Sequence, residues 1–364
     1  MLLWGNPGCG KSEYLKMIAR LLSRHIEIVF GSQMRPEDLG VQTPAGRTVE
    51  LNHPDGKTYK LRLQEPLMPE WFYNLARMPG LFVAEELTTL TPGMQGAMLG
   101  ILQDAILNNI RMHPSTLRVA AANPPEVAAG GYDLAPPTAN RFGHVQFDFP
   151  FDKWVTGINE GFEETNAVPV LPDGWKKEYL PRTKAMITSY LKTNPAATER
   201  LPKDDADKGY AWASRRSWTN AMTVCAAALA SDKEADMVMA AGTCVGRPTA
   251  SEFQAWVMTQ DLMDPEDMLA KPDAVDFDNR LDRTFIMMTS MSAAVQSRNT
   301  ANRWSAAWQI AEKAVEVRAK DVVIKTMGPL CAKEARPAGV KIPKVVGELI
   351  PLIDRIKEGR ARHG

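Results

Sequence analysis

Short apolar runs alternate with helical periodicity through the first 150 residues of the chain. Runs with the length and composition of buried strands lie at residues 2–4, 26–30, 81–83 and 117–121. Apolar residues spaced three and four apart predict helices at residues 13–23, 70–77 and 92–107. Strands that alternate with helices imply crossover connections, and hence a parallel sheet covered by helices on both faces. The pattern therefore predicts an α/β fold for this part of the chain.

Residues 47–63 depart from this pattern. Apolar and polar residues alternate on both sides of Pro54-Asp55-Gly56. Alternation with a period of two is typical of strands, and the proline–glycine cluster is typical of a turn. We predict a β-hairpin inserted into the α/β domain.

Strand signals fade beyond residue 150. Amphipathic patterns predict helices at residues 184–192, 217–229 and 252–263, and a helical block at about 279–320. The polar stretch 193–208 is predicted to be an exposed loop, and residues 336–344 interrupt the pattern before a last short helix. We predict an α/β core at residues 1–150, a helical lid at 151–265 and a helical C-terminal extension at 266–364.

Composition narrows the class of protein. Lys+Arg and Asp+Glu are equal at 43 each, which argues against a general nucleic-acid coat or a polybasic membrane-surface protein. No apolar run approaches the ~20 residues that span a bilayer, and no signal peptide is evident. Cys9, Cys225, Cys244 and Cys331 have no CxxC spacing, so neither a zinc site nor a disulfide framework is indicated. We expect a cytoplasmic protein.

The first chemical motif follows the first apolar run. The segment Gly5-Asn6-Pro7-Gly8-Cys9-Gly10-Lys11-Ser12 matches G-x-x-x-x-G-K-[ST] in full and leads into the helix predicted to begin at Glu13. Glycines let the loop turn its N–H groups toward phosphates, and the helix N-terminus adds partial positive charge. Lys11 can reach the β- and γ-phosphates, and the Ser12 hydroxyl can take one Mg²⁺ position. The alternative is a chance glycine-rich turn.

The strand at residues 81–84 ends in an acidic pair, Glu85-Glu86. In a phosphate-loop enzyme, such carboxylates lie across from the lysine. We predict that Glu85 holds Mg²⁺, mostly through water, and that Glu86 orients and deprotonates water. An aspartate is usual at the first position, and Mg²⁺ tolerates little geometric error, so we expect binding to survive and hydrolysis to be slow. The alternative is an ordinary solvated strand end.

Three polar residues further along complete the candidate site. Asn123 follows the strand at 117–121 and can hydrogen-bond the attacking water or the γ-phosphate, although Asn-Pro is also a common turn. Arg141 closes the α/β region and can project to a neighbouring subunit's γ-phosphate, or form a local ion pair on the surface. Arg216 precedes a lid helix, where it can reach the nucleotide or serve as part of a basic helix start.

Taken in this order, these residues resemble the MoxR branch of the AAA+ ATPases. The likeness rests on GNPGCGKS, FVAEELTTLTP, AAANPPEVAAGGYDLAPPTANRF and SRRSW. It covers roughly residues 1–265 and is strongest over 1–150. FxxEELTT and the NPPE block are closer to a subgroup found mainly in actinobacteria and their phages.

The resemblance implies an AAA+ P-loop NTPase core whose inserted hairpin faces a central pore, followed by a helical lid. It implies these roles: Lys11 and Ser12 as Walker A residues, Glu85 and Glu86 as the Walker B pair, Asn123 as sensor 1, Arg141 as arginine finger and Arg216 as sensor 2. Members typically bind ATP with Mg²⁺ and form hexamers. They work with a partner that carries a von Willebrand factor A domain, and they remodel or mature a target protein.

Two departures leave alternatives open. The segment 108–116 is short for the second pore hairpin of this branch, and the first strand begins at the very start of the chain. Adenine would then be held by a segment upstream of Met1 or mainly by the lid. The leading hypothesis is an oligomeric, chaperone-like ATPase motor, and the runner-up is a nucleotide-gated assembly scaffold with little or no turnover. A monomeric phosphate-loop kinase and a nucleic-acid motor are less favoured.

Overall fold

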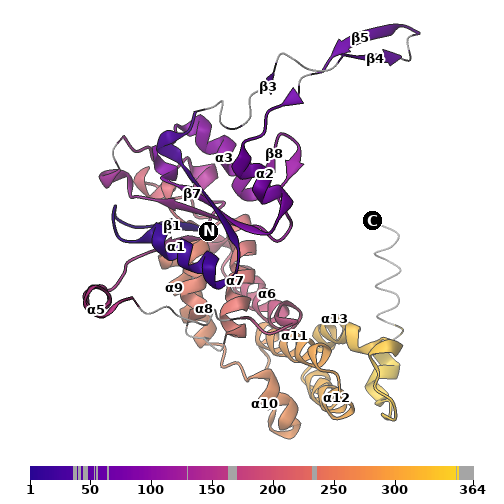
Figure 1. The fold of residues 1–364 in the computed structure, drawn as a ribbon. Coiled ribbons are helices and arrows are strands. Elements are labelled where there is room, and N and C mark those ends of the chain that lie inside the picture. The colour runs from indigo at the N-terminus through magenta and orange to yellow at the C-terminus, as the bar shows by residue number, and fades with distance from the viewer. Residues whose placement is uncertain are drawn as a thin grey trace. The chain divides into compact units, whose positions relative to one another are not determined.

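The chain forms two compact units. The core unit contains Met1–Pro169 and Pro202–Ala211, and the helical unit contains Val170–Leu201 and Trp212–Gly364. The structure is a computed structural model (Figure 1). It describes residues 1–35, 39, 42–43, 48–52, 54, 56–63, 65–128, 130–162, 170–231, 236–349 and 351.

A five-stranded parallel sheet forms the centre of the core unit, in the order β11-β1-β10-β7-β2. The strands are β1 (Leu2–Trp4), β2 (His25–Phe30), β7 (Gly80–Glu85), β10 (Leu117–Ala122) and β11 (His144–Gln146). Three helices cover it: α1 (Lys11–Leu21), α2 (Glu70–Arg77) and α3 (Pro92–Asp104) (Figure 1).

Side chains of the central strands alternate between the two faces of this sheet. Leu3 and Val83 pack in one cluster with Leu15 of α1. Trp4 and Phe82 pack in another cluster, with residues of α2 and α3. The predicted parallel sheet with helices on both faces is therefore confirmed.

Two details of the predicted sheet are wrong. The strand at 26–30 is not buried, because β2 is one of the two edge strands and is only partly covered along its length. The strand β11 was missed, because its sequence His144-Val145-Gln146 carries a single aliphatic residue. Tertiary pairing with β1 creates this strand.

Helix ends also differ from the predictions. The helix α1 starts at Lys11, two residues before the predicted start, so that the phosphate loop leads straight into it. The helix α3 stops at Asp104, because Ala105 has a left-handed backbone (φ 57°). Beyond it, β8 (Ile106–Leu107) and β9 (Ile110–Arg111) form a minimal hairpin. Asn108 and Asn109 form its turn, both with positive φ, which is typical of two-residue hairpin turns.

The predicted inserted hairpin is present among the described residues. Strands β4 (Thr48–Asn52) and β5 (Thr58–Arg62) pair antiparallel, with Val49 opposite Leu61 and Leu51 opposite Tyr59. The pair β3 (Gln42–Thr43) and β6 (Glu65–Pro66) lies at its base along the chain. Arg47, His53 and Asp55 of the predicted hairpin lie outside the described residues. The core unit also contains α4 (Pro136–Ala139), α5 (Phe151–Glu160) and the short turns η1 (Gly31–Gln33), η3 (Leu87–Thr89), η4 (Pro125–Val127) and η6 (Ala206–Gly209).

The helical unit is built around two hydrophobic cores. Trp218 and Phe253 lie in the first core, which joins α6 to α9, and Trp304 and Trp308 lie in the second, which joins α10 to α13. The helices are α6 (Trp175–Thr193), α7 (Arg215–Ala230), α8 (Asp236–Val245), α9 (Arg247–Met258), α10 (Pro265–Ala270), α11 (Leu281–Ser297), α12 (Ala301–Glu316) and α13 (Lys320–Cys331). Short turns are η5 (Pro195–Ala197), η7 (Pro272–Ala274) and η8 (Lys333–Ala335), and residues 344–349 are helical.

The helical character predicted beyond residue 150 is confirmed, but the bounds and the number of the helices differ. The helix predicted at 252–263 is α9, which begins after Gly246 and ends at Met258. The helix predicted at 184–192 is part of α6, which begins at Trp175, and the block predicted at about 279–320 is divided into α11 and α12. The helices α5, α8, α10 and α13 were not predicted. The divisions at residues 150 and 265 stay predictions. No helix among the described residues is long and apolar enough to cross a membrane.

Candidate active site

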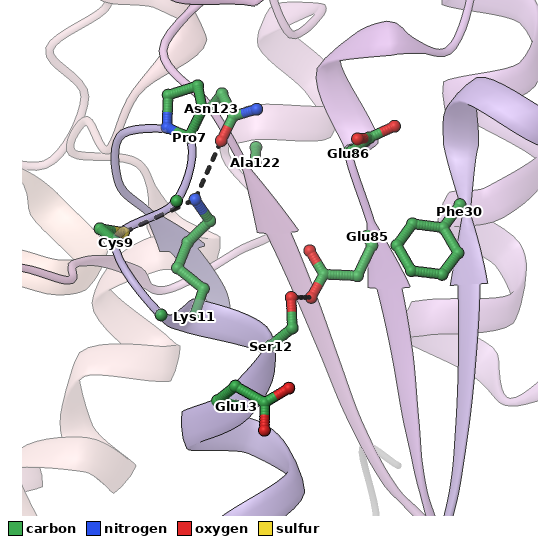
Figure 2. A pocket seen from close by; sticks show the side chains of 12 residues that line it. Pro7, Cys9, Lys11, Ser12, Glu13, Phe30, Glu85, Glu86, Ala122 and Asn123 are labelled. Atoms are coloured by element: carbon green, nitrogen blue, oxygen red, sulfur yellow. Dashed lines mark hydrogen bonds between the residues drawn. The ribbon is translucent and has the colours of Figure 1, made fainter. Parts of the chain in front are cut away.

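The phosphate-loop segment lies at the carboxyl edge of the sheet, between β1 and α1. Gly8 (φ 77°) and Gly10 (φ 94°) have left-handed backbones that favour glycine, which explains two glycines of the motif. A cavity of about 390 Å³ opens beside the loop, within the size range of small-molecule sites. It is lined by Pro7, Gly8, Cys9, Gly10, Lys11, Ser12, Glu13, Phe30, Glu85, Glu86, Ala122 and Asn123 (Figure 2).

Lys11 is 7 % exposed, and its ammonium group contacts three oxygen atoms and, at 3.8 Å, Sγ of Cys9. Its Nζ donates to three oxygen atoms: the carbonyls of Gly5 at 2.7 Å and Asn6 at 3.1 Å, and Oδ1 of Asn123 at 2.9 Å. Figure 2 shows the bond to Asn123. None of these three acceptors is charged, so their dipoles compensate the buried cation only in part. An anionic group in the cavity would complete the compensation.

Ser12 and Glu85, the two predicted metal-binding residues, are in direct contact. The Ser12 hydroxyl donates to Oε1 of Glu85 at 2.6 Å (Figure 2). Glu85 is 5 % exposed at the end of β7, so it is not a solvated strand end. A hydroxyl and a carboxylate are hard oxygen ligands that suit Mg²⁺. The described residues contain no group of three or more His, Cys, Asp or Glu residues arranged for a metal, so phosphate and water oxygens would supply the remaining positions.

Glu86 has an unusual backbone and an unsatisfied side chain. Its φ of 55° and ψ of 42° are left-handed, which is uncommon for a residue with a side chain. The Glu86 carbonyl accepts from the Thr89 amide at 2.9 Å and the Thr89 hydroxyl at 2.8 Å. A Cβ at Gly31 would lie 2.7 Å from this carbonyl, so glycine is required there. Oε2 of Glu86 is buried with no hydrogen-bond partner among the described residues.

Asn123 is fixed at both its side chain and its backbone. Its Oδ1 accepts from Lys11, and its carbonyl accepts from the hydroxyl of Thr88 at 3.1 Å. Thr88 is fully buried in η3, the turn that directly follows the acidic pair. The amide of Tyr132 donates to the Thr88 carbonyl at 2.7 Å. One turn therefore connects the acidic strand end to Asn123 and to the loop that leads to α4.

Arg141 does not line the cavity. It follows α4, and its Nη1 donates to the carbonyl of Pro137 at 2.7 Å, while its Nε is buried without a hydrogen-bond partner among the described residues. Among the described residues Arg141 forms no ion pair, so the alternative of a local ion pair is not observed there. Arg141 is therefore held by the backbone of the preceding helix, α4, and has hydrogen-bonding capacity left.

Arg216 belongs to the helical unit, and the cavity belongs to the core unit. It is exposed in the first turn of α7. A capping box of Ser214 and Ser217 starts this helix, and the neighbouring Arg215 lies 3.4 Å from Glu199. The role of Arg216 at the nucleotide stays a prediction.

A buried histidine supports the strand that precedes the phosphate loop. Nδ1 of His144 accepts from the Trp4 indole at 2.8 Å, and its Nε2 lies 2.9 Å from the Ala139 carbonyl, to which it can donate. This pairing requires the neutral ring with its proton on Nε2. Burial lowers the pKa of His144 to about 4. The ring links β1, β11 and the end of α4 while carrying no charge at neutral pH.

Most predicted site residues surround the cavity, and a few do not. Gly5 and Asn6 hold Lys11 through their carbonyls and do not line the cavity. Phe30 and Ala122 line it and were not predicted. Each is the last residue of a strand, β2 and β10 respectively, so its place at the carboxyl edge of the sheet is the signal that could have identified it.

Comparison with protein families identifies the core. Residues 1–142 match the family model of the AAA domain, dynein-related subfamily. The core has the AAA+ fold. Among solved structures, the chain is similar to a candidate ATPase from Cytophaga hutchinsonii, with 16% identity and a TM-score of 0.38, over 68% of this chain and 76% of that chain. This likeness is too weak to bear on function. No curated protein matches the chain significantly.

Proposed function

We propose that the AAA+ core binds ATP with Mg²⁺ and hydrolyses it. The observation that carries this proposal is the convergence of Lys11, Ser12, Glu85, Glu86 and Asn123 on one cavity beside the phosphate loop (Figure 2). A buried lysine, a hydroxyl–carboxylate pair and an unsatisfied carboxylate are the groups that phosphoryl transfer to water requires.

Each residue has a role in this scheme. Lys11 and the N–H groups of the loop bind the β- and γ-phosphates, and Asn123 orients Lys11 and the terminal phosphate. Ser12 and Glu85 would hold Mg²⁺, which neutralises phosphate charge when bound. Glu86 accepts a proton from the attacking water, since its buried Oε2 has no hydrogen-bond partner among the described residues.

We further propose that the chain works as an oligomer of MoxR type, with hexameric rings as the expected assembly. Arg141 lies outside the cavity of its own subunit and has hydrogen-bonding capacity left, which supports a role at a neighbour's nucleotide. The sequence resemblance adds remodelling or maturation of a protein complex, with a von Willebrand factor A domain protein as the partner. Arg216 would contact the nucleotide from the lid of the same subunit.

One observation favours a second candidate, a nucleotide-gated assembly scaffold with little or no turnover. Glu85 stands where an aspartate is usual, and its longer side chain reaches the Ser12 hydroxyl at 2.6 Å. Both groups must separate or rearrange before they hold a metal ion, and Mg²⁺ tolerates little misplacement. Nucleotide would then bind and organise the assembly while hydrolysis stays slow.

Calorimetry and steady-state assays at high protein concentration distinguish these functions. We expect the wild-type protein to bind MgATP, and Lys11→Ala to abolish binding, because Lys11 is the cation that lines the cavity. Lys16→Ala is the matched control, since Lys16 is exposed and pairs with Glu13 on the same helix. Unchanged ATP affinity in Lys11→Ala would contradict the site. Binding without turnover in the wild type would favour the scaffold.

A further inference from the structure

An aromatic pair lies beside the phosphate loop and has no role in the scheme above. Tyr14 is in the first turn of α1, and Phe147 directly follows β11. Their ring centroids are 5.1 Å apart, with an angle of 45° between the ring planes. Tyr14 is 39 % exposed, whereas Phe147 packs against the buried cluster beneath α1. One ring is thus anchored and supports another ring that remains accessible.

Both aromatic residues are attached to the ends of the loop. The amide of Tyr14 donates to the carbonyl of Gly10 at 3.0 Å. At the other end, a Cβ on Gly5 would lie 2.7 Å from the carbonyl of Phe147, so the absence of a side chain at Gly5 permits this approach. The amide of Phe147 donates to the carbonyl of Trp4, the residue before the loop, at 2.7 Å. The position of the pair relative to the loop is therefore fixed by the backbone.

The order of strands indicates which end of a nucleotide lies near this pair. In the order β11-β1-β10-β7-β2, the strands β11 and β7 lie on opposite sides of β1. Glu85 and Glu86 mark the β7 side as the end for the terminal phosphate and metal ion. A triphosphate held at Lys11 with its terminal phosphate toward β7 directs its sugar and base toward β11. Tyr14 and Phe147 lie on that side.

We propose that Tyr14, backed by Phe147, is the stacking platform for the purine base of the bound nucleotide. The proposal rests on the proposed function, since it concerns the other end of the same ligand. An exposed aromatic ring stacks on a base through its π face, and the base covers apolar surface that is otherwise wet. The base is then held by the core unit. The sequence had instead suggested a segment upstream of Met1 or the lid.

The test compares a ligand that has a base with one that lacks it. Affinities of MgATP and of magnesium tripolyphosphate are measured by calorimetry for the wild type, Tyr14→Ala and Tyr14→Phe. We expect Tyr14→Ala to weaken ATP binding by ~5–150-fold, the usual worth of one stacked base, and to leave tripolyphosphate binding unchanged. Tyr14→Phe keeps the ring and is expected to bind both ligands like the wild type. Tyr73→Ala, at a tyrosine that is 58 % exposed on α2, is the matched control.

Several outcomes overturn the proposal. Unchanged ATP affinity in Tyr14→Ala excludes stacking on this ring, and an equal loss for both ligands means that the substitution disturbs the loop instead. Equal affinity of the wild type for ATP and tripolyphosphate means that the base is not held. If the wild type binds neither ligand, the proposed function itself fails. Thermal unfolding of Tyr14→Ala in the absence of ligand verifies that the variant is folded.

Discussion

Glu86 combines two features that cost free energy in a folded protein. Its backbone is left-handed, and Oε2 of its carboxylate is buried without a partner among the described residues. Features of this kind cost about 1–3 kcal/mol each and often mark functional sites. The surrounding contacts fix the conformation, because Thr89 donates twice to the Glu86 carbonyl and Gly31 leaves room for it. A carboxylate held in this way is suited to accept a proton from water.

Substitutions of the acidic pair test this interpretation. We expect Glu86→Gln to bind ATP while stopping hydrolysis, because the amide has the same shape and cannot accept the proton. Glu85→Asp is expected to leave hydrolysis intact or raise it, because it restores the usual ligand length at the metal. Steady-state phosphate release measures both. If Glu85→Asp abolishes turnover and Glu86→Gln has no effect, the two roles are reversed.

His144 gives the stability of the core unit a dependence on pH. Burial lowers its pKa to about 4 in the folded state, against about 6.5 for an exposed histidine. Below pH ~6.5 the unfolded chain takes up a proton that the folded chain does not. The contribution of His144 is therefore fully present above that pH and is lost as the pH falls toward 4, in total about 3 kcal/mol.

Urea unfolding of the wild type and of His144→Gln measures this effect. Glutamine can also donate to the Ala139 carbonyl, and it has no titrating group. We expect the stability advantage of the wild type to be largest at neutral pH and to shrink as the pH is lowered to about 4.5. The comparison cancels the titration of Asp and Glu residues common to both proteins. A difference that does not vary with pH would show that His144 is charged or exposed in the folded protein.

At the scale of elements, the sequence predicted a strand correctly where the strand is a buried apolar run. The strands β1, β7 and β10 are apolar runs within the sheet, and all three were predicted. The edge strand β2 was located but wrongly assigned as buried, since its sequence does not record which strand lies beside it. The strand β11 has almost no apolar signal and depends on pairing with β1. Its position matters for the site, because Phe147 follows it.

For the candidate site, too, local patterns predicted some residues and not others. A motif with fixed spacing predicted Lys11 and Ser12, and the ends of apolar strands predicted Glu85, Glu86 and Asn123. Phe30 and Thr88 were not predicted, because their relation to the site exists only in the assembled sheet edge. The hydroxyl of Thr88 reaches a carbonyl 35 positions further along the chain. No local pattern encodes such a contact.

The turn η3 is the element that connects these residues, and Thr88 tests its importance. We expect Thr88→Val to bind ATP with wild-type affinity and to hydrolyse it about tenfold more slowly, because Asn123 loses the hydrogen bond to its carbonyl. Thr88→Ser keeps the hydroxyl and should retain most of the activity. Measured KM and kcat separate this effect from a general loss of folding. Equal rates in Thr88→Val and the wild type would assign Thr88 a purely structural role.

At the scale of the whole molecule, the chain passes between the two units more than once. Residues 202–211 lie in the core unit, whereas the preceding α6 and the following α7 lie in the helical unit. The ring of Tyr210 in this segment packs against Trp4, directly before the phosphate loop, with ring centroids 4.9 Å apart and an angle of 43° between the ring planes. Arg216 follows this segment closely along the chain. Residues 202–211 therefore contribute an aromatic contact to the core unit.

Hydrolysis at a site shared between subunits is the central claim, and Arg141 tests it. An arginine that acts on a neighbour's nucleotide should leave ATP binding intact when replaced by alanine, while hydrolysis falls ~10³-fold or more. The structure is consistent with this division, because Arg141 is absent from the lining of its own cavity. Lys11→Ala subunits still carry Arg141, and Arg141→Ala subunits still carry an intact phosphate loop.

Mixing these two inactive variants is the most direct measurement. In a mixed assembly, some interfaces pair an intact nucleotide site with an intact Arg141, so the account predicts that part of the ATPase activity returns. The activity should rise with the fraction of mixed interfaces as the mixing ratio approaches equality. A monomeric enzyme cannot recover in this way. A mixture that stays inactive, although co-assembly is demonstrated independently, would contradict the shared-site mechanism.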